Sequence, residues 1–175
     1  MRGYVRLLRS PYAARVLAGT LVGRVPSAMA GVAIPLTLRD SGAGYGFVGL
    51  VAGAFAVAAA VGGPCWGRLV DRAGQWRVLL CCAVGSGAGS VVIALAPARA
   101  VLVVLGAVLA GAATPPLEPC LRALWPDLVA AEVLESAYAL DSASQELVFI
   151  GGPLVVAGCA AAGSRPPRRS PGWSP

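Results

Sequence analysis

A few polar side chains interrupt otherwise apolar stretches of this sequence, at places where they could bind an ion or carry a proton. Arg24 lies within the first apolar stretch. An ionisable group inside a membrane span is costly and is therefore a candidate for function by default. Facing a central cavity, Arg24 would hold an anionic substrate or a carboxylate. The equally weighted alternative is that it snorkels to the interface or that the span is shifted.

Asp141, Gln145 and Glu146 open the last apolar stretch. Asp141 and Gln145 are four residues apart, which places them on one face of a helix. These residues are candidates for lining a polar cavity or for a proton relay, and the alternative, which we favour, is a position at the membrane–water interface. For Glu118 the expectation is an i, i+4 ion pair, because Arg122 follows four residues later.

The sequence contains neither a catalytic constellation nor a pattern typical of a metal site. It has no histidine, and its five cysteines form no C-x-x-C pair. We interpret the cysteines as small apolar packing residues and expect no catalytic residues, no metal and no cofactor. An integral membrane enzyme is therefore the least favoured class.

The segment Gly67–Gly74 lies between two long apolar stretches and is rich in charge. Gly67 lets one helix approach the next, and Gly74 permits a turn. Asp71 is expected just before the following helix, where a carboxylate interacts with free backbone N–H groups and the positive end of the helix dipole. Arg72 and Arg77 flank Asp71 and can pair with it or with lipid headgroups.

This segment resembles the signature loop of the major facilitator superfamily, G-x-x-x-D-R-x-G followed by basic residues. Four positions match, namely Gly67, Asp71, Arg72 and Gly74. Gln75 and Trp76 stand where the family usually has basic residues, and Arg77 comes one place later. The resemblance implies that the loop is a conformational gate, which engages the other half of a transporter in one state and releases it in the other.

A weaker resemblance concerns Gly151, Gly152 and Pro153, which are similar to the glycine- and proline-rich fifth-helix motif of the drug/proton antiporter branch. It implies a helix-packing role for these residues and export by proton antiport. Family members have two six-helix halves with the substrate site between them, so that a complete pathway would need a second six-helix half.

Long apolar helices must position all of these residues. The chain is 57% hydrophobic and only 13% charged, about half the usual charged share. Charge-free stretches of 18 or more residues follow Asp40, Arg77, Arg99 and Glu146. About 20 apolar residues cross the hydrocarbon core as a helix, and these stretches lack the alternation of a membrane β-barrel. We expect an all-α polytopic transmembrane bundle of about five spans, resembling the N-terminal half of the major facilitator fold.

The expected organisation has three parts. Residues 1–12 form a basic leader, residues 13–162 a transmembrane helical domain, and residues 163–175 a disordered tail rich in proline and arginine. The spans are expected at roughly 13–38, 45–66, 78–96, 100–117 and 138–162. A cleaved signal peptide is disfavoured for the first span, because Arg24 breaks its apolar core.

The positions of the arginines predict the topology. Residues 1–15 carry four arginines and the Gly67–Arg77 loop carries three, whereas Arg39 and Arg99 are alone in the opposite loops. The positive-inside rule then places the N-terminus in the cytoplasm of a multi-pass plasma-membrane protein. The net charge of +6 is a signal for topology and headgroup contact rather than for nucleic-acid binding. The tail arginines would lie outside, against the rule, so we expect a truncation or a reading-frame change near residues 158–164.

These features predict a major facilitator membrane transporter that moves a small solute of unknown identity by secondary active transport. Export by proton antiport is the finer hypothesis. The expected partner of the protein is the lipid bilayer that surrounds it. The alternative is a non-transporting truncated membrane fragment or a small membrane scaffold protein.

Overall fold

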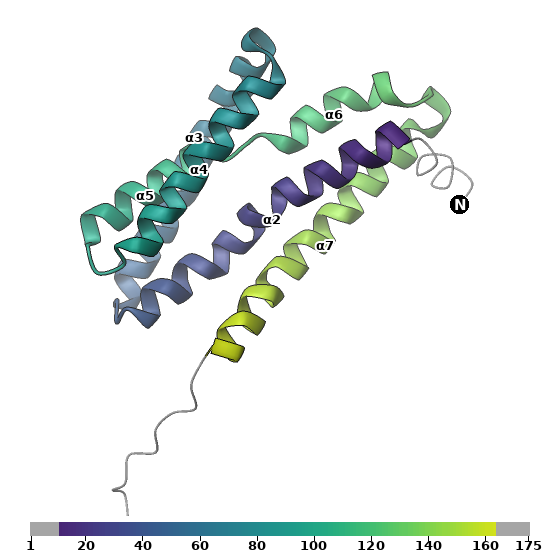
Figure 1. Cartoon of the computed structure of the whole chain (residues 1–175). Helices are drawn as coiled ribbons and strands as arrows, with labels where there is room; N and C mark the ends of the chain where they lie inside the picture. The colour runs from purple at the N-terminus through teal and green to yellow at the C-terminus, as the bar shows by residue number, and fades with distance from the viewer. Residues whose placement is uncertain (1–10, 164–175) are drawn as a thin grey trace, which may run out of the picture.

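The computed structural model describes residues 11–163 as helices joined by short turns (Figure 1). The helices are α2 (Pro11–Asp40), α3 (Tyr45–Ala73), α4 (Gln75–Leu95), α5 (Ala100–Ala112), α6 (Leu117–Leu128) and α7 (Ala131–Gly163). No strand occurs in this part of the chain, so the predicted all-α fold is confirmed. Residues 1–10 of the expected leader and residues 164–175 of the expected tail lie outside the described residues.

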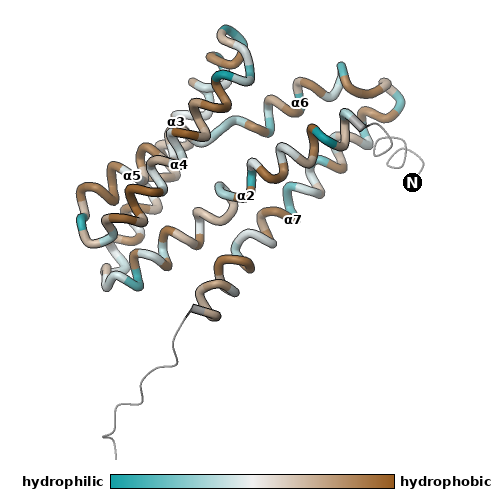
Figure 2. Tube along the Cα trace, viewed as in Figure 1, coloured by the Kyte–Doolittle hydropathy of each residue, from teal (hydrophilic) through white to brown (hydrophobic). Residues whose placement is uncertain are grey.

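Five helical segments are long and apolar enough to cross a membrane. Four of them are α2 from Tyr12, α3, α4 and α7 to Ala162, and the fifth combines α5 and α6 over Ala100–Leu128. Figure 2 shows that hydrophobic residues follow the lengths of α3, α4 and α5, whereas hydrophilic residues collect near the turns. The chain is therefore a multi-pass membrane protein, as the sequence predicts.

Two helices continue beyond the apolar stretches that the sequence delimits. α3 runs past Trp66 to Ala73, so that most of the charged segment after Gly67 is helical. The turn to α4 is the single residue Gly74, whose φ of 87° is a conformation that suits glycine. α7 begins at Ala131 rather than near Tyr138. A helix can continue into the aqueous phase, because hydropathy limits the membrane segment and not the helix itself.

The helices pack in two groups. α3, α4 and α5 form one group, α2 lies along α7, and α6 contacts both α2 and α7. Glycine allows the closest approaches in the first group: a Cβ at Gly62 would meet the backbone of Ala112, and a Cβ at Gly111 would meet the backbone of Phe55. Packing of small residues is the usual means of helix association in a membrane, because apolar side chains gain little free energy when they move from lipid into a helix interface.

The helix ends alternate as antiparallel spans require. The start of α2, the α3–α4 turn and the α6–α7 turn lie toward one end, and the α2–α3 turn, the α4–α5 turn and the end of α7 lie toward the other (Figure 1). The exposed Arg68, Arg72 and Arg77 belong to the first end, whereas Arg39 and Arg99 belong to the second.

Candidate functional site

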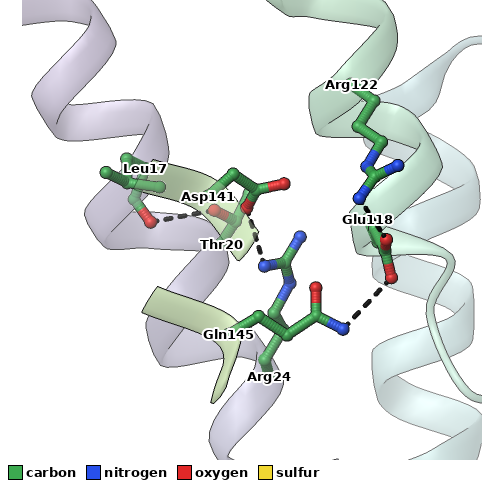
Figure 3. A network of polar contacts seen from close by, with 7 residues as sticks. All are labelled: Leu17, Thr20, Arg24, Glu118, Arg122, Asp141 and Gln145. Atoms are coloured by element: carbon green, nitrogen blue, oxygen red, sulfur yellow. Dashed lines mark hydrogen bonds and ion pairs between the residues drawn. The ribbon is translucent and has the colours of Figure 1, made fainter. Parts of the chain in front are cut away.

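Arg24 of α2 and Asp141 of α7 form a buried ion pair (Figure 3). Arg24 Nη1 donates to Asp141 Oδ1 over 2.8 Å, and the two side chains are 7% and 0% exposed. At 1.5 Å per residue, Arg24 lies about 20 Å from the start of α2, which is near the middle of this 30-residue helix. The pair is therefore a buried charged site near the middle of the first membrane-spanning helix.

The close packing of α2 on α7 brings this pair together. Gly152 of α7 is buried, and a Cβ there would lie 3.1 Å from the Cβ of Ala28 in α2. Its neighbour Gly151 has open space around its Cβ position, and Pro153 lies half-buried within α7. Of the three residues in the glycine–proline motif, Gly152 is the one that allows the close approach of α2 and α7.

Each member of the pair has one polar side-chain atom that makes no hydrogen bond within the described residues. Arg24 Nη2 and Asp141 Oδ2 are buried and have no hydrogen-bond partner among the described residues. Buried polar groups are nearly always hydrogen-bonded, because leaving one unsatisfied costs about 1–3 kcal/mol. The site is thus electrically neutral as a pair but still has one donor and one acceptor to offer to a solute or a water molecule.

A second set of polar contacts lies one helical turn along α7. Gln145 Nε2 donates to Glu118 Oε2 of α6 over 3.2 Å. Glu118 Oε1 accepts from Arg122 Nη2 over 3.0 Å, which confirms the predicted i, i+4 pair. Figure 3 shows these side chains beside the Arg24–Asp141 pair. Polar groups from α2, α6 and α7 therefore converge in one region of the bundle.

Not every candidate residue joins this region. Glu146 is exposed, and no hydrogen bond or ion pair links it to the described part of the chain. Thr20, one turn before Arg24, donates its hydroxyl to the carbonyl oxygen of Leu17 over 2.8 Å. The contact between Gln145 and Glu118 was not anticipated, because nothing in the sequence indicates which helix faces α7.

The charged segment at the end of α3 occupies a different place from the ion pair. Asp71 and Arg72 are exposed in the last turn of α3, and Arg77 is exposed in the first turn of α4. No ion pair joins Asp71 to either arginine within residues 11–163.

The expected capping role of Asp71 is wrong. The N-cap of α4 is Gly74, and no side chain makes a capping hydrogen bond there. The physical reason is that α3 remains helical to Ala73, so that Asp71 belongs to the preceding helix. Asp71 instead lines a cavity of about 170 Å³ together with Gly67, Gln75 and Cys120 of α6.

The sequence profile of the Major Facilitator Superfamily matches residues 16–174. No curated protein and no solved structure matches the chain. The matched range includes both members of the buried ion pair and the whole charged segment between α3 and α4.

Proposed function

The chain belongs to the Major Facilitator Superfamily, and on that basis we propose that it forms part of a secondary transporter that moves a small solute across the plasma membrane. The observation that carries this proposal is the buried ion pair between Arg24 and Asp141, which joins two membrane-spanning helices. Ionisable residues within spans are rare and costly, and they mark substrate paths and proton relays.

The chemistry of the pair supports coupling between a solute and a proton. Protonation of Asp141 removes the negative charge and releases Arg24 Nη1, and deprotonation restores the attraction. A solute that binds Arg24 Nη2 or Asp141 Oδ2, the atoms without partners among the described residues, would compete with the ion pair for these two side chains. Proton antiport, and hence export, follows as the finer form of the proposal.

The segment from Gly67 to Arg77 takes the gating role in this proposal. The side chains of Asp71 and Arg72 are exposed at one end of the bundle and are free to contact a second six-helix half. If these side chains contact the second half in one conformation and release it in the other, this end of the bundle would open and close during alternating access. The N-terminus is proposed to be cytoplasmic, on the same side as this segment.

Proton flux in proteoliposomes tests the proposal. The purified chain is reconstituted with a pH-sensitive dye inside, a pH gradient is imposed, and representatives of three solute classes are added in turn: ethidium, arabinose and arginine. Transport would be supported if one solute class collapses the gradient with the wild-type chain but does not collapse it with Asp141→Asn. Failure of all three classes with the wild-type chain would contradict transport by this chain and favour the non-transporting fragment.

Two controls separate lost function from lost folding. Asp141→Glu keeps the carboxylate and is expected to retain part of the flux. Glu146→Gln changes an exposed carboxylate five residues away and is expected to keep the wild-type flux. All variants must elute as single species in detergent before their fluxes are compared.

A further inference from the structure

A largely apolar groove lies between α2, α4 and α6, apart from the polar region already described. Its volume is about 530 Å³, and it lies toward the end of the bundle that holds the α3–α4 turn. Apolar side chains from three helices line it, among them Val16, Leu79, Leu80, Leu117, Leu121 and Leu124. The groove is therefore suited to hydrocarbon and not to a polar solute.

Glycine residues on α2 help to create this groove, because they have no side chain. Gly19 lines the groove, and no atom lies within 4 Å of the position that its Cβ would take. Gly23 also lines it, but a Cβ there would meet Leu117 Cδ1 at 2.8 Å. The space beside Gly19 is therefore open, whereas the space beside Gly23 is filled by α6.

The groove has the features of a lipid site at its outer end. Trp76, in the first turn of α4, is 76% exposed and forms part of the lining. Tryptophan is enriched at membrane interfaces, where its ring lies at the headgroup level. Arg15 is exposed and lies one helical turn from Gly19 on the same face of α2, and the exposed Arg77 adjoins Trp76 in α4. Neither arginine lines the groove itself, but each lies within one helical turn of lining residues at this end of the bundle. Apolar walls with positive charge nearby match an acyl chain with an anionic headgroup.

The size of the groove favours an acyl chain over a helix. A helix is at least 10 Å wide, so 530 Å³ would hold only about 7 Å of its length, whereas a helix that crosses the core extends about 30 Å. We propose that the groove binds one acyl chain of an anionic phospholipid, with the headgroup phosphate between Arg15 and Arg77. Apart from Arg77, which also belongs to the proposed gating segment, this site is separate from the Arg24–Asp141 pair.

Lipid retention on the purified chain tests the site. The chain is extracted in mild detergent with equal amounts of phosphatidylglycerol and phosphatidylcholine that carry the same acyl chains, and bound lipid is counted by native mass spectrometry. One phosphatidylglycerol per chain is expected to be retained in preference to phosphatidylcholine. Each of Arg15→Gln and Arg77→Gln should lower the preference about fivefold, since an arginine near an anionic surface contributes about 1 kcal/mol.

A groove-filling variant tests where the acyl chain lies. Gly19→Leu should remove most of the retained phosphatidylglycerol, whereas Gly31→Leu should not. Gly31 is the matched control because it lies in the same helix, is exposed and has no atom within 4 Å of its Cβ position. Arg99→Gln, at the opposite end of the bundle, is the control for charge.

Three results would overturn the proposal. The first is equal retention of the two lipids by the wild-type chain, which would indicate ordinary annular lipid. The second is an unchanged preference in Gly19→Leu. The third is a dimer that Gly19→Leu dissociates, which would show that a helix of a second copy occupies the groove.

Discussion

Arg24 and Asp141 lie 117 residues apart in the chain, yet their side chains form a 2.8 Å ion pair that joins α2 to α7. Removing one partner of a buried pair leaves an uncompensated charge and costs about 3–5 kcal/mol. We expect Asp141→Asn and Arg24→Gln each to lower the free energy of unfolding by about 3 kcal/mol, measured by unfolding in mixed micelles.

A double substitution separates pairing from a mere loss of polarity. Arg24→Gln combined with Asp141→Asn removes both charges and should be more stable than either single variant, because no buried charge remains. Additive losses in the double variant would contradict a direct interaction between the two residues.

The glycine contacts between α3 and α5 lead to a second prediction. A Cβ at Gly62 would collide with the backbone of Ala112, and backbone cannot move aside as a flexible side chain does. We expect Gly62→Ala to lower the unfolding free energy by about 1–3 kcal/mol, as overpacking does. Gly53→Ala is the matched control in the same helix, since no atom lies within 4 Å of its Cβ position. It should be neutral or stabilising by up to about 1 kcal/mol; equal losses in the two variants would refute the packing explanation.

Hydropathy and charge were sufficient to predict the helical membrane architecture. Four charge-free stretches and a first apolar stretch that contains Arg24 predicted about five spans, and five segments of the described structure meet the length and hydropathy of a span. The ends of the helices were harder to predict. α3 continues through Asp71 to Ala73, because a charged residue ends a membrane segment without breaking the helical hydrogen bonds.

The polar site was predictable only as separate residues. Arg24 and Asp141 each stood out as costly charges in apolar surroundings, but their pairing depends on the packing of α2 on α7. The Gln145–Glu118 hydrogen bond likewise requires α6 to face α7. Sequence spacing predicts which residues share a face of one helix, as it did for Glu118 and Arg122, and contains no direct information on which faces meet.

The alternation of helix ends leads to a third prediction, which concerns orientation. Ser41 lies at the α2–α3 turn and Ala73 at the α3–α4 turn, so the two residues belong to opposite ends of the bundle. In a background without the native cysteines, Ser41→Cys should react with a membrane-impermeant maleimide in intact cells. Ala73→Cys should react only after the cells are opened, because the positive-inside rule keeps the arginine-rich end in the cytoplasm. The reverse pattern would place the N-terminus outside.

The exposed Asp71 provides the sharpest test of the proposed gate. Its carboxylate is exposed and makes no hydrogen bond or ion pair with the described residues, so Asp71→Asn should change the unfolding free energy by no more than about 0.5 kcal/mol. If the residue contacts a second six-helix half during transport, the same variant should nevertheless reduce solute-driven proton flux at least tenfold in a preparation that contains both halves. Asp127→Asn is the matched control, because Asp127 is also an exposed carboxylate but belongs to α6. A gate requires that only the Asp71 variant lose flux while both remain folded; equal fluxes in the two variants would remove Asp71 from the mechanism.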